Sequence, residues 1–438
     1  MKKLGLLIAG ALLLSLALVA CAPAAPTEAP AVQPEATEEP MAEATEEPMA
    51  EATEEPMAEM PYPFGDVRVR QALAYLIDRD EIIDRAIQGQ VDPLYSFVPP
   101  GFLGANEAFL DLYGTGADVA AAEELLSAAG YSADNPLTFD IWYPPEHYGT
   151  YAAQMFQVIK EQMEATPMIK VTLQSQEWST YVGAAINGEY MVSYLGWFFD
   201  FPDTSNYLEP FALCGATVGT FYCSDEMDGY LATGRASTDQ AVREEAYVNA
   251  QNLFAEEVAS IPLTYEGEFV VLNPNTTSNV VIGPTFNFQY ELTEFTEPKD
   301  DLIYGTTDQI SSLDYQDAYA VHDWELMRNI NIGLMGFAPG TADLVTGTAA
   351  DFPEVSDDGL TYTFTLADGW AYPDGTPLVA GDYVRGINRA LALADESDVA
   401  GTLVTPYVAS VEAPDDQTVV FTLSTPVGFF PLLVASAP

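Results

Sequence analysis

The stretch SDDGLTYTFTLADGWAYPDGTPLVAGDYVRGINRAL, residues 356–391, predicts a strand, two turns and a helix in succession. Its segment 361–366 alternates apolar residues with threonines, the pattern of a strand that is buried on one face. Asp374 and Gly375 favour a turn, and residues 382–393 are predicted to be helical. The apolar face of the strand is predicted to consist of Tyr362, Phe364 and Leu366.

Two later segments extend this pattern. Residues 418–423 alternate in the same way, with Val419, Phe421 and Leu423 on one face. The chain then reaches PLLVASAP at 431–438, an apolar run for which the sequence shows no closing element. We therefore expect a half-buried sheet in this part of the chain, and an incomplete domain around it.

Composition limits the classes of partner. The chain has 438 residues, of which 66 are acidic and 14 basic, and its formal net charge is −52. Nucleic acids and anionic membrane surfaces attract basic patches, so this charge argues against both as partners. Cationic ligands or a high-salt habitat remain compatible with it, as does an acidic surface that simply maintains solubility.

The first residues have the features of an export signal. Lys2 and Lys3 precede an apolar run that ends immediately before Cys21. A basic start followed by a short apolar core is typical of a signal peptide, and the run is short for a membrane span. Residues 18–21 resemble the bacterial lipobox, which implies a signal peptide at 1–20 and lipidation of Cys21.

Residues 21–62 are rich in Pro, Ala, Thr and Glu and contain EATEEPMA three times in register. Such a composition offers little apolar surface to bury, so we expect a disordered tether. Its glutamates repel one another and favour an extended chain. The tether would hold a globular body away from the membrane.

The globular part begins with FGDVRVRQALAYLIDRDEIIDRAIQGQ at 64–90. Apolar residues at helical spacing predict one helix there, and Asp80 is expected to cap a second. Strands and helices then alternate, which predicts an α/β fold with a mixed or parallel sheet covered on its faces. The remaining predicted helices are 118–130, 151–164, 177–190 and 240–257, and the strands are 137–143, 169–174, 191–197 and 301–309.

Several segments resemble one family. They are FGDVRVRQALAYLIDRDEII (64–83), GEYMVSYLGWFFDFPDTSNYLEPF (188–211), AEEVASIPLTYEG (255–267), DLIYGTTDQISSLDYQDAY (301–319) and DDGLTYTFTLADGWAYPDGTPLVAGDYV (357–384). Together they are similar to the family 5 extracellular solute-binding proteins, which are the peptide, oligopeptide and nickel binding proteins of ABC importers. The resemblance covers most of the chain from Phe64 onward.

The resemblance implies a two-lobe fold like that of periplasmic binding proteins (type II, cluster C-like). It assigns residues 63–258 to a complete second lobe, 259–299 to a segment that returns to the first lobe, and 300–438 to an incomplete, permuted first lobe. In the family the last of these segments comes first. A middle block with a Gly-Thr-Gly-Pro-Tyr turn and an Asn-Pro-x-Tyr-Trp stretch is not found here. A circular permutation, a piece of a tandem array and a rearranged or misassembled gene are the open explanations, and we expect a fragment.

The implied function is a substrate-binding lipoprotein of an ABC importer. It would capture peptides, or similar small cationic or zwitterionic solutes, and deliver them to permease and ATPase subunits. Motifs of common hydrolases, P-loops and dinucleotide sites are missing from the sequence, so neither an enzyme nor a cofactor is expected. The alternatives are a non-transporting remnant and, less favoured, a hydrolase that uses Asp200 and Asp203 as a carboxylate pair.

The segment GWFFDFPDT carries the candidate ligand site. Asp200 stands where peptide-specific members of the family have an aspartate that receives the ligand's α-ammonium group, and Gly196, Trp197 and Phe199 are candidates for the pocket wall. Thr204 replaces a proline that is frequent in the family. The alternative for Asp200 is a role in a turn or a helix cap.

Cys214 and Cys223 stand nine residues apart in a chain expected to be exported. Thiols tend to oxidise in that environment, so a disulfide between them is predicted, with two free buried thiols as the alternative. No metal site is expected, because the two histidines, His147 and His322, lack metal-binding spacing.

Overall fold

The computed structural model describes residues 63–216, 218, 221–267, 271–273, 275, 277–285, 287–303, 310, 312–316, 318, 321–393 and 404–437. These residues all belong to one compact unit, Pro56–Pro438. The predicted signal peptide, Cys21 and the tether lie outside the described residues, as do residues 304–309 of the strand predicted at 301–309.

The first helices form largely as predicted. Asp66 caps α1 (Val67–Tyr75), whose apolar face is buried. The second helix, α2 (Arg79–Ile82), continues as a π-helical turn, η1 (Ile83–Ile87). Its cap is Asp78 and not Asp80, because the side chain of Asp78 accepts from the backbone N–H of Glu81 at 2.9 Å. Asp80 lies inside the helix, whereas Asp78 has the extended backbone that a capping residue needs.

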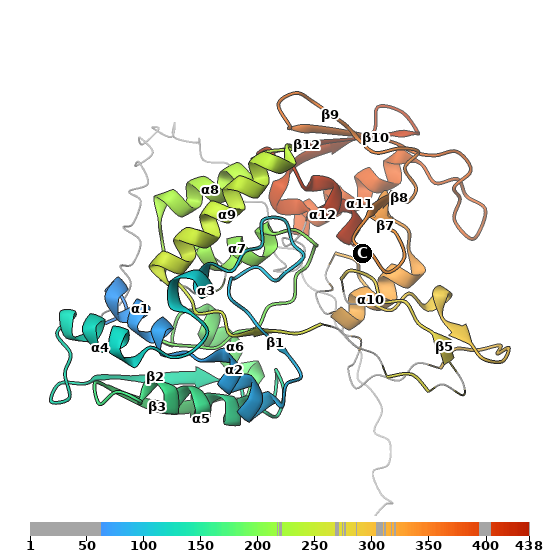
Figure 1. The fold of residues 1–438 in the computed structure, drawn as a ribbon. Coiled ribbons are helices and arrows are strands. Elements are labelled where there is room, and N and C mark those ends of the chain that lie inside the picture. The colour runs from blue at the N-terminus through green and yellow to red at the C-terminus, as the bar shows by residue number, and fades with distance from the viewer. Residues whose placement is uncertain are drawn as a thin grey trace, which may run out of the picture. The chain divides into compact units, whose positions relative to one another are not determined.

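Two parallel strands lie beneath these helices. β2 (Leu137–Tyr143) pairs along its whole length with β3 (Ile169–Ser175), and α5 (Ala152–Met163) connects them (Figure 1). α4 (Val119–Ala128) packs on α1, while α5 packs on β3 and on η1. The inward residues of both strands and the apolar faces of the helices form one core, which confirms the predicted alternation of strands and helices here.

The strand predicted at 191–197 is reduced to one parallel bridge between Trp142 and Ser193. At this point the hydroxyl of Tyr181 on α6 (Trp178–Ile186) contacts the segment. It accepts from the backbone N–H of Tyr194 at 2.8 Å and donates to the carbonyl of the same residue at 2.8 Å. The same backbone N–H also donates to the carbonyl of Trp142 at 3.1 Å. The pairing ends there because the next residue that would donate from the neighbouring strand, Pro144, has no backbone N–H.

A second group of helices follows. It comprises α3 (Ala108–Tyr113), α7 (Ser205–Ala212), α8 (Asp225–Ala236) and α9 (Gln240–Glu257), which share a core rich in aromatic residues (Figure 1). α9 spans the predicted range 240–257. The short strands β1 (Asp92–Pro93) and β4 (Thr264–Tyr265) pair with each other and bring the two ends of this region together.

The C-terminal part contains the predicted half-buried sheet. Its four antiparallel strands have the order β11 (Val408–Glu412), β12 (Thr418–Leu423), β10 (Thr361–Thr365) and β9 (Glu354–Val355). Phe364 pairs with Val419, and the predicted apolar faces of both strands are buried. α11 (Ala380–Leu393) packs on β11 and β12. The apolar run near the end of the sequence forms α12 (Phe430–Ser436), which buries Phe430 and Leu433 in the same core.

The remaining elements are short. β5 (Thr277–Asn279) pairs with β6 (Glu294–Phe295), and β7 (Met335–Phe337) pairs with β8 (Leu344–Thr346). α10 (Val321–Ile330) precedes β7, and two single 3-10 turns occur at Tyr290–Leu292 and Thr405–Tyr407.

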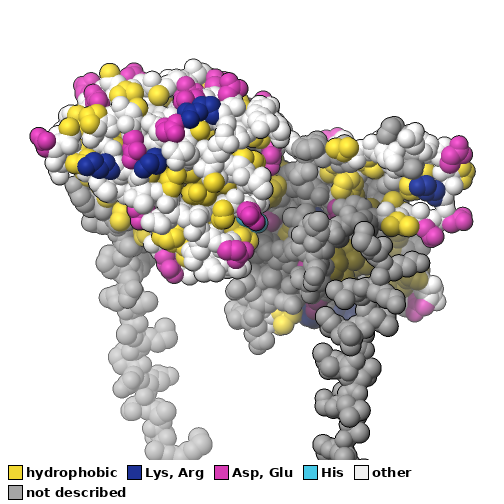
Figure 2. Space-filling view, turned by 90° about the horizontal axis from the view of Figure 1, so that it is seen from below, with side chains coloured by type: hydrophobic (Ala, Val, Ile, Leu, Met, Phe, Trp, Pro, Cys, Tyr) yellow, Lys and Arg dark blue, Asp and Glu magenta, His cyan; other side chains and the backbone are white. Residues whose placement is uncertain are grey.

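The surface agrees with the acidic composition. Figure 2 shows acidic side chains spread over the face in view, with a few basic side chains among them. Within the described residues, no helix has the length and apolar character needed to cross a membrane. The same residues contain no group of three or more His, Cys, Asp or Glu side chains arranged to hold a metal ion.

Candidate functional site

Residues between 64 and 267 line a cavity of about 650 Å³. Its wall is predominantly aromatic and aliphatic, with contributions from both groups of helices and from the β4 segment. Binding sites for small molecules are usually apolar hollows of about 300–1,000 Å³ with a few polar groups. The aromatic residues on the wall include Phe97, Phe102, Trp197, Phe199, Tyr207 and Tyr222.

Three of the four predicted ligand-binding residues border this cavity. Gly196, Trp197 and Phe199 line it, but Asp200 is not among its lining residues. The backbone N–H of Asp200 donates to Oδ1 of Asn206 at 2.9 Å, and Nδ2 of Asn206 donates to the carboxylate of Asp200 at 3.4 Å. Burial lowers the pKa of Arg328 to about 10, and the charge of Asp200 opposes this effect. Asp200 therefore interacts with groups of its own chain.

Asn206 organises this segment, although the sequence did not single it out. It lies on α7, and its Oδ1 also accepts from the indole N–H of Trp197 at 3.2 Å. One buried amide thus holds both Trp197 and Asp200. These hydrogen bonds depend on how the chain turns between residues 197 and 206, which no local sequence pattern predicts.

Tyr148 is a second residue that sequence reasoning missed. Its ring lines the cavity next to Gly196, and its hydroxyl donates to the Gly196 carbonyl at 3.4 Å. A Cβ atom at position 196 would lie 2.7 Å from the Tyr148 ring, so only glycine allows this close approach. Burial raises the pKa of Tyr148 to about 12, which keeps its hydroxyl a neutral donor at physiological pH.

The carboxylate of Asp203 is buried and bonded to other side chains of the protein. Its side chain is 5% exposed and pairs with Nη2 of Arg243 at 2.5 Å. The hydroxyls of Ser205 and Tyr247 donate to its other oxygen at 2.7 and 3.3 Å. Both carboxylate oxygens are therefore engaged within the chain.

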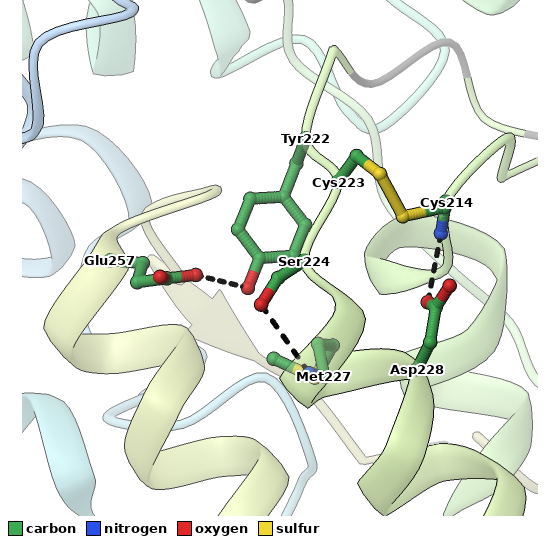
Figure 3. Close-up of a disulfide and its surroundings, with 7 residues drawn as sticks. All are labelled: Cys214, Tyr222, Cys223, Ser224, Met227, Asp228 and Glu257. Carbon is green, nitrogen blue, oxygen red and sulfur yellow. Dashed lines mark hydrogen bonds between the residues drawn. A yellow bond between two sulfur atoms is a disulfide. The ribbon is translucent and has the colours of Figure 1, made fainter. Parts of the chain in front are cut away.

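A disulfide joins Cys214 and Cys223 between α7 and α8 (Figure 3). The backbone N–H of Cys214 donates to Asp228 at 3.0 Å, and Ser224, which follows Cys223, caps α8 through the backbone N–H of Met227. The loop that the disulfide closes contributes Val218, Phe221 and Tyr222 to the cavity wall. The disulfide therefore constrains part of the candidate site.

Comparison with known proteins agrees with the sequence motifs. The model of "Bacterial extracellular solute-binding proteins, family 5 Middle" matches residues 27–218 and 343–438, together more than half of the chain. The chain belongs to this family. The family model matches in two separate segments, with the residues between them unmatched.

Curated relatives cover part of the chain. The chain is 30% identical over 207 residues to the periplasmic oligopeptide-binding protein OppA of Salmonella typhimurium, and the match covers 46% of this chain and 37% of that protein. It is 27% identical over 225 residues to the dipeptide-binding protein of Escherichia coli, covering 50% and 41%. The matches thus span about two fifths of the length of these family members.

Solved structures of the family give partial matches as well. Haemophilus influenzae OppA in complex with RPPGFSPFR is 26% identical, with a TM-score of 0.40, and the match covers 47% of this chain and 40% of that one. Helicobacter pylori DppA in complex with the peptide STSA is 25% identical, with a TM-score of 0.41 over 47% and 40%. Both of these structures are complexes with a peptide.

We expect reduction of the Cys214–Cys223 disulfide to lower the free energy of unfolding by about 2.5 kcal/mol, because the bond restricts a short loop of the unfolded chain. Thermal unfolding of the Cys214→Ser/Cys223→Ser variant measures the effect. The Cys21→Ser variant is the matched control, since Cys21 forms no part of this loop. Equal unfolding temperatures for the double variant and the control would contradict the prediction.

Proposed function

We propose that this chain is the substrate-binding component of an ABC importer, and that it captures peptides or similar small zwitterionic solutes. The observation that carries the proposal is the aromatic cavity bordered by Gly196, Trp197 and Phe199, in a chain that belongs to family 5. Relatives named for oligopeptide and dipeptide binding support peptides as the class of ligand. The ligand would be held between apolar walls and oriented by a few polar groups.

The proposed receptor of the ligand's α-ammonium group is Asp200. It follows Phe199 directly, so a modest shift of the segment would bring its carboxylate to the cavity. Its bond to Asn206 is long at 3.4 Å, and exchanging it for a bond to an ammonium group would gain a charge-assisted contact. Glu266 is the other candidate, because it already lines the cavity.

We expect wild-type protein to bind free peptides about 10- to 100-fold more tightly than their N-acetylated forms, since a charged hydrogen bond contributes about 1.5–3 kcal/mol. Asp200→Ala should remove most of this preference, and Glu266→Gln should retain it. Titration calorimetry with a library of di- to pentapeptides, free and acetylated, measures both. If Glu266→Gln removes the preference and Asp200→Ala keeps it, the ammonium site belongs to Glu266. If no peptide binds to wild type, the proposed function is wrong.

We further propose that the protein is exported and held at the outer face of the cytoplasmic membrane by a lipid on Cys21, where it would deliver its ligand to permease and ATPase subunits. The basic start, the apolar run and the lipobox-like residues 18–21 support this location. The Pro- and Glu-rich segment after Cys21 would act as the spacer.

Cys21→Ser should release the protein from the membrane fraction into the soluble fraction. Without a lipid, nothing in the acidic body favours an anionic membrane surface. Fractionation followed by detection of the protein measures the change, and Cys214→Ser/Cys223→Ser is the control that should stay with the membrane. Retention of Cys21→Ser in the membrane fraction would show that another segment is the anchor.

A further inference from the structure

One cationic side chain, that of Arg70, lines the cavity among the described residues. Arg70 lies on α1, and Leu73 and Ile77, which follow it at helical spacing, line the same cavity. Arginine is scarce in this chain, where 66 acidic residues outnumber 14 basic ones. A cation placed on the wall of an apolar cavity in such a chain calls for an explanation, because losing its hydration costs free energy.

The position of the guanidinium is fixed by two backbone carbonyls. Nε of Arg70 donates to the carbonyl of Glu257 at 2.8 Å, and Nη1 donates to the carbonyl of Phe64 at 2.7 Å. A guanidinium has five N–H donors, so these bonds leave three for another partner. Within the described part of the chain no ion pair joins Arg70 to a carboxylate.

The surroundings of Arg70 help to keep it available. The nearby carboxylate of Glu257 accepts a hydrogen bond from the hydroxyl of Tyr222, as Figure 3 shows. Tyr222 lines the cavity, but Glu257 does not. Burial lowers the pKa of Arg70, while the negative charge of Glu257 opposes this effect, so the group stays protonated at neutral pH.

We infer that Arg70 is a binding residue for a carboxylate group of the ligand, most simply the C-terminal carboxylate of a peptide. A guanidinium whose orientation is already fixed can form short, charge-assisted hydrogen bonds to a carboxylate, and the partly dry cavity strengthens them. This inference rests on the proposed function and adds a second charged contact to it. The competing explanation is that Arg70 only caps the C-terminal end of α9 through the Glu257 carbonyl.

The test compares a library of di- to pentapeptides with the same library prepared as C-terminal amides, by titration calorimetry on the purified chain. We expect wild type to bind the free acids roughly tenfold or more tightly than the amides. Arg70→Met should bring the ratio close to one, and Arg70→Lys should restore part of it. The matched control is Arg68→Met, on the same helix but exposed and paired with Asp66.

The outcomes separate the explanations. Equal binding of acids and amides by wild type would overturn the role of Arg70 and leave the proposed function standing, and this comparison needs no variant to fold. A preference for acids that survives in Arg70→Met would also overturn it. Failure of wild type to bind either library would overturn the proposed function and the inference together.

Discussion

Arg243→Met is expected to lower the free energy of unfolding by about 3–5 kcal/mol, because it leaves a buried carboxylate without its cation. Arg243 joins three elements at once. Its Nη2 pairs with Asp203 at 2.5 Å and donates to the hydroxyl of Tyr247 at 3.2 Å, and its Nε donates to the carbonyl of Gly234 at 2.9 Å. Removing the guanidinium therefore breaks the connection between α8, α9 and the turn before α7.

Chemical denaturation of three variants measures this effect. Arg85→Met is the matched control, because Arg85 pairs with Glu81 and Glu161 on the exposed surface and should contribute less than about 1 kcal/mol. The double variant Asp203→Asn/Arg243→Met should recover part of the loss, since it also removes the unpaired charge. If Arg243→Met and Arg85→Met lower the free energy of unfolding equally, the buried ion pair contributes no more than the exposed one, and the prediction is wrong.

The regular elements of this chain were predictable where local patterns decide burial. β10 and β12 follow from strict alternation, since every second side chain faces the same core. α9 spans the range 240–257 that its helical sequence predicted. For these elements the local pattern decides between helix and strand, and packing across the core affects only how stable the element is.

Elements whose pairing depends on residues elsewhere in the chain were not predictable. The segment 191–197 has the composition of a strand, yet its pairing stops after one bridge, because the next donor on the neighbouring strand would be Pro144, which has no backbone N–H. The capping residue of α2 was misplaced by two positions, because Asp78 and Asp80 are chemically equivalent and only the backbone conformation distinguishes them.

The candidate site divides along the same line. Motif resemblance led to Gly196, Trp197 and Phe199, which do line the cavity, and to Asp200, which is held by Asn206 outside its wall. Arg70 was not among the site residues that the motifs indicated. Arg70 precedes Leu73 and Ile77 at helical spacing, so it lies on the same side of the helix as these apolar residues. A charged residue in that position is a sequence signal that could have indicated a site on the inner side of the helix.

The free energy of unfolding is expected to fall between about pH 4.5 and pH 7 because of one buried carboxylate, Glu209 on α7. Burial raises its pKa to about 7, with the charge of Asp203 in the same direction, although Arg235 and Arg243 oppose the change. Nε of Arg235 lies 3.4 Å from Oε1 of Glu209, yet no hydrogen bond reaches this oxygen in the described structure. An ion pair of that geometry does not compensate for the lost hydration, so burial decides the direction.

The sign follows from proton binding. In this pH window the folded chain keeps the proton on Glu209, while the unfolded chain, with an ordinary glutamate, loses it. The stabilisation from this group is therefore complete below about pH 4.5 and lost as the pH rises through 7, a change on the order of 3 kcal/mol.

Glu209→Gln removes the titrating group, so the free energy of unfolding of this variant should decline less over the same pH window. Glu81→Gln is the control with the opposite sign, because hydrogen bonds from Gln162 and Arg85 lower the pKa of Glu81. Denaturation of the three proteins at pH 4.5, 5.5, 6.5 and 7.5 gives the slopes, and parallel curves for wild type and Glu209→Gln would exclude a role for Glu209.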